Sequence, residues 1–139
     1  MKPQSAKAKG RLFQQQIRDK LIEQLEIHPE DIKSTSMGAG GEDITMARAA
    51  REKFPLSIEC KAQESLSVWK AYEQAEANCG DYEPVLFIKK NRKKPLVVVD
   101  ADYFISLFKP WRIIKKLLRF MEVINTYEPG ETWMYFIKK

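Results

Sequence analysis

Residues 56–61, Leu56-Ser57-Ile58-Glu59-Cys60-Lys61, decide the fold that this sequence predicts. Apolar and polar side chains alternate along them without a break, which is the period of a β-strand with one buried face. The first, third and fifth side chains are therefore expected in a core, and the other three on the opposite face. Glu59 and Lys61 are then expected side by side on one rigid surface, where a carboxylate lies next to an ammonium group.

Length and composition favour a single globular domain. The chain has 139 residues, of which 44% are apolar, and this is enough for one core but not for two ordinary domains. The net charge of +5 mildly favours a polyanionic partner. Cys60 and Cys79 form neither a disulfide framework nor a metal-binding spacing, so we expect reduced thiols in the cytoplasm. No apolar stretch approaches the length of a membrane span, and the first residues do not begin a signal peptide.

Local patterns predict a mixed α/β fold. Helices are expected at residues 10–26, 68–79, 102–108 and 110–125, and strands at 44–47, 56–61, 84–89, 96–99 and 133–137. The segments between them are read as a basic arm, a glycine-rich loop and a charged connection, at residues 1–9, 34–41 and 48–54. The order helix, two strands, helix, two strands (αββαββ) predicts a mixed sheet flanked by helices. We expect the whole chain to form one domain, with a core at about 7–108 and a helix–strand extension at 109–139.

A second acidic residue, together with Glu59, indicates a metal-binding site. Asp43 directly follows the glycine-rich loop, and Asp43 and Glu59 are hard ligands of the kind that Mg²⁺ or Mn²⁺ takes in phosphodiester hydrolysis. The carbonyl of Cys60 is a third candidate ligand, because a strand exposes its backbone where pairing ends. Lys61 would orient or deprotonate a water, or stabilise the transition state. The alternative is a solvated Glu59–Lys61 surface pair worth less than about 1 kcal/mol.

These residues carry a resemblance to a known family. The chain resembles the PD-(D/E)xK nuclease superfamily, with Gly41-Glu42-Asp43 at its Pro-Asp pair and Glu59-Cys60-Lys61 at its Glu-x-Lys. Lys9-Gly10 and the Ser/Gly-rich loop are most similar to Holliday-junction resolvase-like endonucleases of archaea and phages. The likeness covers residues 7–100 approximately. It implies a restriction-endonuclease-like fold, a magnesium-dependent endodeoxyribonuclease and, for a phage protein, the host cytoplasm.

The resemblance also points to accessory residues and to one departure. Many such resolvases carry a Glu on the first helix, where this chain has Gln14, so a one-metal mechanism is favoured over a two-metal one. Gln74, on the helix after the strand, stands where related nucleases carry a Gln that approaches the lysine and the phosphate. Its alternative is a solvated side chain. Glu42 is an alternative ligand to Asp43, although neighbours on an extended segment face opposite ways.

Basic side chains predict where DNA lies. The residues expected to contact phosphates are Lys9, Ser36, Lys90, Arg92, Lys93 and Lys94. A turn that serves solubility alone is the alternative for the cluster at residues 90–94. No recognition module for bases is apparent, so we expect selectivity for the shape of branched or double-stranded DNA.

The C-terminal extension and the function itself leave alternatives open. One face of residues 111–125 is apolar and the other basic, which fits packing on the core sheet or a homodimer, and fits a membrane helix less well. The expected activity is that of a structure-selective DNA endonuclease. A non-catalytic nucleic-acid-binding protein on a nuclease-like fold is the first alternative, and an RNA-directed nuclease is the second.

Overall fold

The computed structural model describes residues 3–35 and 40–125. The chain divides into two compact units, Met1–Val99 and Asp100–Lys139. The first unit contains the sheet and every residue of the predicted metal site, and the second contains two helices. We therefore describe the two units separately, and the prediction of one domain over the whole chain stays a prediction.

A five-stranded mixed sheet forms the centre of the first unit. Its strands are β1 (Ile32–Ser34), β2 (Ile44–Met46), β3 (Leu56–Ala62), β4 (Glu83–Lys89) and β5 (Leu96–Val98), and they lie in this order across the sheet. β3 and β4 pair in parallel, whereas the other neighbours pair antiparallel. The predicted mixed α/β class is confirmed, with β3 in the middle of the sheet.

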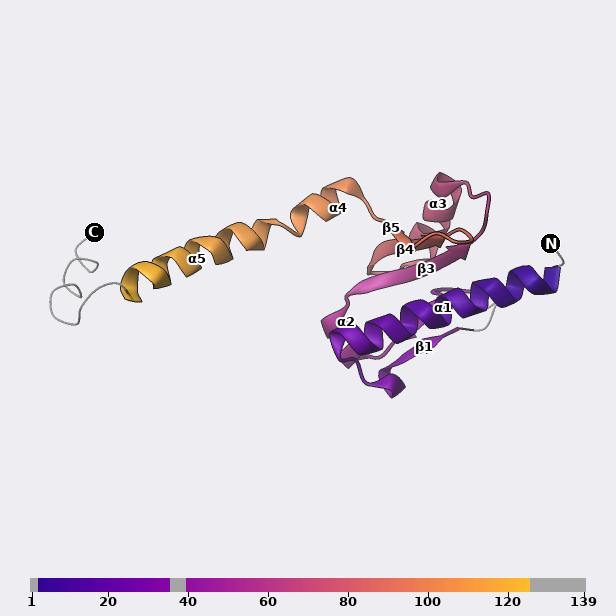
Figure 1. Cartoon of the computed structure of the whole chain (residues 1–139), viewed down its shortest axis with the longest axis horizontal. Coiled ribbons are helices and arrows are strands. Elements are labelled where there is room, and N and C mark those ends of the chain that lie inside the picture. Colours follow the sequence, from indigo (N-terminus) through magenta and orange to yellow (C-terminus); the bar gives the residue numbers. More distant parts are fainter. Residues whose placement is uncertain (1–2, 36–39, 126–139) are drawn as a thin grey trace. The chain divides into compact units, whose positions relative to one another are not determined.

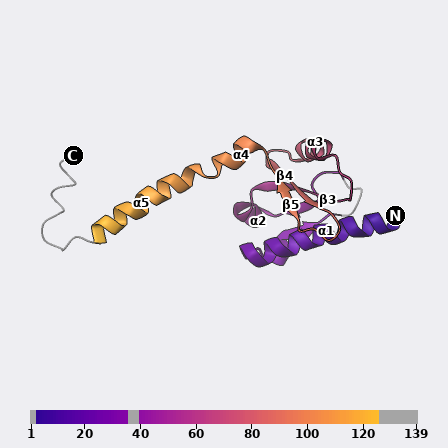
Figure 2. The ribbon, with the colours of Figure 1, turned by 45° about the horizontal axis from the view of Figure 1, so that its top comes forward.

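Helices cover both faces of this sheet. α1 (Pro3–Leu25) contacts β1 and β3, and α3 (Val68–Asn78) contacts β3 and β4. Both views of the ribbon place α1 and α3 on opposite sides of the sheet (Figures 1 and 2). A short 3-10 turn at Pro29–Asp31 and the helix α2 (Arg48–Lys53) complete the unit.

Three local predictions need correction. The predicted basic arm belongs to α1, which begins at Pro3, because the alanines and lysines of residues 6–9 are good helix formers and proline is tolerated in a first turn. A short connection is expected at residues 30–33 and the loop from residue 34, but Ile32–Ser34 form the edge strand β1, which pairs with β2. The charged connection forms α2. With β1 added, the sheet has five strands in place of the four expected between residues 44 and 99.

Both faces of β3 are buried. Phe13, Ile17 and Leu21 recur every four residues and so form one apolar stripe of α1. This stripe is buried in one core cluster with Ile58 and Cys60, as the stripe and the strand alternation predict. The polar face of β3 is also covered, however. Ser57 and Glu59 are each only 3% exposed, because helices lie on both sides of the sheet. The carboxylate of Glu59 is therefore inside the protein.

The second unit holds α4 (Ala101–Ser106) and α5 (Lys109–Asn125), which confirms both predicted C-terminal helices. Asp100 caps α4 by accepting a hydrogen bond from the Tyr103 N–H at 2.8 Å. The predicted strand at 133–137 lies outside the described residues. Across residues 3–35 and 40–125, no helix combines the length and apolar character of a membrane span. Packing or dimerisation of α5 stays a prediction.

Candidate functional site

A cavity of about 420 Å³ opens where α1, α3 and the middle of the sheet meet. All of the predicted catalytic and metal-binding side chains or backbone groups line it. They are Gln14, Asp43, Glu59, Cys60, Lys61 and Gln74. The fold therefore brings together residues that are spread over sixty positions of the chain, from Gln14 on α1 to Gln74 on α3.

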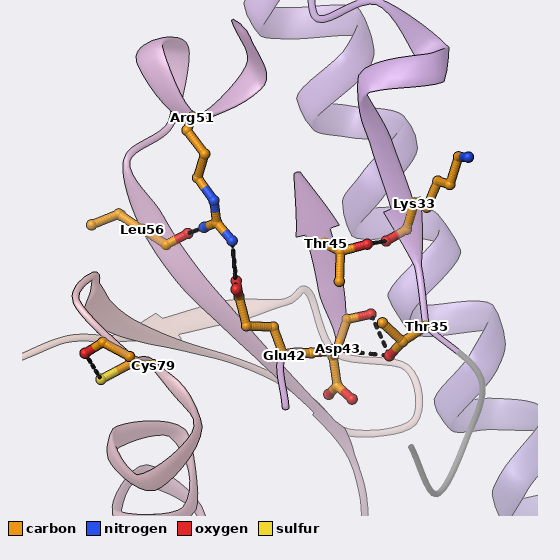
Figure 3. A network of polar contacts seen from close by, with 9 residues as sticks. Lys33, Thr35, Glu42, Asp43, Thr45, Arg51, Leu56 and Cys79 are labelled. Carbon is orange, nitrogen blue, oxygen red and sulfur yellow. Dashed lines mark hydrogen bonds and ion pairs between the residues drawn. The ribbon is translucent and has the colours of Figure 1, made fainter. Parts of the chain in front are cut away.

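Backbone hydrogen bonds fix the position of Asp43. Its N–H donates to the carbonyl of Ile58 at 2.9 Å, and its carbonyl accepts from the N–H of Thr35 at 2.9 Å. The Thr35 hydroxyl also donates to the carbonyls of Glu42 and Asp43, at 3.0 and 3.2 Å (Figure 3). Thr35 thus ties together the two ends of the glycine-rich loop. Asp43 is held on the sheet and does not depend on the loop for its place.

The carboxylate of Asp43 accepts a hydrogen bond from the backbone of β3 at the point where the pairing of β3 with β2 ends. Its Oδ2 accepts from the N–H of Cys60 at 2.7 Å, just beyond Ile44 and Ile58, where the pairing of β2 with β3 ends. The N–H and C=O of one strand residue point to the same side. The Cys60 carbonyl is therefore directed to the side on which the Asp43 carboxylate lies, as a third oxygen ligand requires.

The thiol of Cys60 has a different environment. It belongs to the apolar core, and burial raises the pKa of this thiol far above its usual range, to which the charges of Asp43 and Glu59 add. The sulfur stays protonated at neutral pH and is no metal ligand. Cys60 can contribute only its carbonyl oxygen.

Glu59 and Lys61 form an ion pair inside the site. Oε1 of Glu59 lies 2.7 Å from Nζ of Lys61, and their side chains are only 4% and 20% exposed. The alternative of a solvated surface pair is therefore wrong, because helices cover this face of β3 as well. The lysine ammonium is held beside a buried carboxylate and borders the cavity.

Asp43 and Glu59 place two neighbouring carboxylates in a buried site, which makes it unfavourable for both to carry a negative charge. The pKa of Asp43 is raised to about 6, mainly by burial and in smaller part by the nearby charge of Glu59. The Cys60 N–H, the Lys61 ammonium and a side-chain hydrogen bond with Gln14 act in the opposite direction. Because these partners do not offset the burial, the site favours the arrival of a cation or a proton.

Two glutamines complete the cavity wall. Gln14 is only 3% exposed and forms a side-chain hydrogen bond with Asp43, so it faces the acidic residues from α1. Gln74 borders the cavity from α3 and is exposed to solvent. Asn78, one helical turn beyond Gln74, lines the same wall and was missed, although the i, i+4 spacing from Gln74 could have indicated it.

A second buried ion pair lies beside the site and was also missed. Nη2 of Arg51 donates to both carboxylate oxygens of Glu42, each at 2.5 Å (Figure 3). Nη1 of Arg51 donates to the carbonyl of Leu56 at 2.6 Å. The guanidinium also lies over the ring of Tyr82, 4.1 Å from its centre. Glu42 is thus held by Arg51 and does not line the cavity, which removes the support for Glu42 as an alternative ligand to Asp43.

The donors of the cavity fit a hard divalent cation. Within the described part of the chain, no group of three or more His, Cys, Asp and Glu side chains could hold a metal. Two carboxylates, one directed carbonyl and the amide of Gln14 are nevertheless oxygen donors of the kind that Mg²⁺ accepts. Mg²⁺ keeps several waters and is usually bound through one or two carboxylates. Softer metals would require more histidine or thiolate ligands.

The basic residues that are predicted to contact DNA do not line the cavity that holds the carboxylates. Nζ of Lys9 donates to Oδ1 of Asn91 at 2.7 Å, which connects α1 to the β4–β5 turn. Lys9 and Lys90 line a smaller cavity of about 190 Å³ that shares Ala62 with the carboxylate cavity. Lys93 and Lys94 line a further groove beside the same hairpin, whereas Arg92 is an exposed turn residue. Ser36 lies outside the described residues.

Comparisons with known proteins add no family assignment. No family model, no curated protein and no solved structure matches this chain. The resemblance to PD-(D/E)xK nucleases therefore stays a prediction, and any function must be argued from the cavity and its residues.

Proposed function

We propose that this protein is a metal-dependent endonuclease that hydrolyses phosphodiester bonds in DNA. The observation that carries the proposal is the shared cavity of Asp43, Glu59 and Lys61, in which both acidic side chains are placed by the middle of the sheet. An aspartate at the end of a strand beside a Glu-x-Lys strand is the arrangement that the resemblance implies. The raised pKa of Asp43 supports a site that is completed by a cation.

The residues have distinct roles in this proposal. Asp43, Glu59 and the Cys60 carbonyl would hold Mg²⁺ or Mn²⁺, which neutralises phosphate charge and lowers the pKa of a bound water. Lys61, oriented by Glu59, presents its ammonium group to the water or to the negatively charged transition state. Gln14 hydrogen-bonds Asp43 and fixes its carboxylate.

The substrate follows from the surroundings of the cavity. Lys9, Lys90 and the other cations of the β4–β5 turn would contact phosphates, which positions DNA but reads no bases. Selectivity would then depend on DNA shape, as in the Holliday-junction resolvase-like enzymes of phages. A homodimer would supply two cuts at a four-way junction.

Cleavage assays with matched variants test this function. Plasmid and four-way-junction DNA are incubated with Mg²⁺ or with a chelator, using wild type, Asp43→Asn and Lys61→Met. Both variants are expected to lose at least about 100-fold in rate, because they remove a metal ligand or a charge that stabilises the transition state. Lys70→Met is the matched control, since Lys70 is exposed on α3 and does not line the cavity. Equal rates for all four proteins would refute the site.

One observation favours a second candidate, a non-catalytic nucleic-acid-binding protein. Gln14 occupies the position at which the resemblance implies a third carboxylate, and it adds an oxygen without a charge. This alternative expects salt-sensitive DNA binding without cleavage. Titration calorimetry with Mg²⁺ and Mn²⁺ separates the two candidates, because only the endonuclease requires a metal that binds at Asp43 and Glu59.

A further inference from the structure

A groove of about 490 Å³ lies between the end of β3, the start of α3 and the β4–β5 hairpin. Its apolar side chains are Leu66, Val68, Ile88 and Leu96. Ile88 and Leu96 are directly paired across the antiparallel β4–β5 ladder, so their side chains share one face and form an aliphatic floor. The floor of the groove is therefore built by the sheet, whereas its other walls include Gln63, Leu66 and three lysines from the neighbouring loops.

Lysines surround this floor. Four of them line the groove, but the ammonium of Lys89 donates to Oε1 of Gln16 on α1, so Lys90, Lys93 and Lys94 are the cations available to a ligand there. No acidic side chain is among the lining residues. A turn that serves solubility alone would need no apolar floor beneath its lysines. Phosphate contacts alone would not need one either, because phosphates are bound by charge and hydrogen bonds. The combination suits a ligand that carries negative charge on one part and a flat apolar surface on another.

The groove shares one wall residue with the proposed catalytic cavity. Gln63 lines both, and its N–H donates to the carbonyl of Lys89 at 3.1 Å, which fastens the end of β3 to the hairpin. A polynucleotide whose phosphate reaches Lys61 would therefore place a neighbouring nucleotide near Gln63. This shared wall favours a nucleotide of the same DNA strand over an unrelated small anion.

We propose that the groove binds an unpaired nucleotide of DNA next to the scissile phosphate, with its base on Ile88 and Leu96 and its phosphates on the lysines. This inference rests on the proposed function for the identity of the polymer. In a continuous duplex the base is paired and stacked, so it cannot reach the floor, and extruding it costs free energy. The preferred substrate class is thus DNA with an unpaired nucleotide at a flap, loop or junction.

Binding measurements test the groove independently of catalysis. Fluorescence anisotropy in a chelator compares a short duplex with the same duplex carrying a single-stranded flap. Leu96→Ser is the test variant and Val97→Ser its matched control, because these neighbours on β5 are similarly exposed, at 53% and 51%, and only Leu96 lines the groove. We expect Leu96→Ser to weaken flap binding about fivefold and to leave duplex binding unchanged, whereas Val97→Ser changes neither.

A second pair of variants tests the charged part. Lys93→Ala should reduce the slope of log affinity against log salt by about 1 for flap DNA, and Lys70→Ala should not. Equal binding of flap and duplex by the wild type, or equal effects of Leu96→Ser and Val97→Ser, would overturn the proposal. Because binding is measured without metal, a protein that binds flaps through Leu96 in the chelator yet cleaves no DNA when Mg²⁺ is added would support the groove and refute the endonuclease.

Discussion

Two buried ion pairs of the first unit differ in how completely they are satisfied. Arg51 and Glu42 have side chains that are 9% and 18% exposed, and Glu59 and Lys61 have side chains that are 4% and 20% exposed. Arg51 gives its guanidinium to both oxygens of Glu42, to the carbonyl of Leu56 and to the ring of Tyr82. Glu59 instead has Asp43, a second acid, as its neighbour, and both border a cavity.

The difference separates a structural pair from a functional one. A closed arginine pair connects α2, the start of β3 and the residue before Asp43, so it helps to hold the frame in which Asp43 lies. The pair of Glu59 and Lys61 is open on one side, and its acidic neighbour carries a raised pKa. Folding alone gains nothing from two acids in one cavity. Such an arrangement is typical of sites that bind a ligand.

The largest expected effect breaks the structural pair. Arg51→Met leaves the partly buried Glu42 carboxylate without its partner, and we expect the free energy of unfolding to fall by about 3 kcal/mol. Urea denaturation measures this loss. Arg48→Met is the control, because Arg48 is 94% exposed and its pair with Glu52 is a surface pair, so its effect should stay below about 0.5 kcal/mol. Equal losses in both variants would contradict a special role of Arg51.

The next prediction concerns Asp43, the acidic neighbour of the functional pair. A change there should raise the stability of the metal-free protein and weaken the binding of metal. Asp43→Asn removes one of two neighbouring negative charges and keeps an oxygen for the Cys60 N–H, so the metal-free variant should melt at a higher temperature than wild type. Mg²⁺ at about a hundredfold excess over its Kd should stabilise wild type by about 2.7 kcal/mol, and the variant far less.

Thermal melts with and without Mg²⁺ measure both parts of this prediction. Asp81→Asn is the matched control, because Asp81 is exposed and does not line the cavity. It should respond to Mg²⁺ as wild type does. A variant at position 43 that loses stability without metal, or that keeps the full response to Mg²⁺, would place Asp43 in the frame and not in the site.

The residues that sequence alone could predict are those with a local signal. The alternation of residues 56–61 identified β3, and the spacing of Asp43 from the Glu-x-Lys motif identified the centre of the cavity. The apolar stripe of α1 likewise gave Phe13, Ile17 and Leu21 as core residues. These features repeat over several residues or combine rare neighbours, so that they can be read without knowledge of the rest of the fold.

The features that could not be predicted from the sequence depend on contacts between distant segments. β1 and α2 have three and six residues, which is too short for a reliable period. Arg51 looks the same in a charged segment whether it is exposed or buried, and its three partners come from separate segments. The burial of Glu59 also depends on two helices that cover opposite faces of the sheet. The groove floor of Ile88 and Leu96 required the register of β4 and β5.

A smaller effect is the pH dependence of the metal-free protein. The pKa of Asp43 in the folded state is about 6, above its ordinary value of 3.8, so the folded protein binds this proton more tightly than the unfolded chain. The contribution of Asp43 to stability is therefore greatest below 3.8 and is lost as the pH rises through about 6. The difference in unfolding free energy between wild type and Asp43→Asn should follow this course in a chelator. A difference that is constant with pH would contradict it.

The smallest expected effect comes from adding a negative charge beside Asp43. Gln14→Glu would bring a third carboxylate beside Asp43, because Gln14 is buried and hydrogen-bonds that residue. More ligand charge tightens divalent binding, so the Kd for Mg²⁺ should fall about fivefold, while the metal-free protein should lose stability. Calorimetry with Mg²⁺ and melting in a chelator measure the two changes.

Gln15→Glu makes this last prediction specific. It changes the net charge equally from the next position of α1, and Gln15 does not line the cavity, so neither the Kd for Mg²⁺ nor the stability should change much. A general effect of added negative charge would act in both variants. An effect confined to position 14 would mean that the cavity accepts a third acid and that its glutamine limits how tightly a cation is held. An unchanged Kd in Gln14→Glu would mean that Gln14 only supports Asp43 through its hydrogen bond.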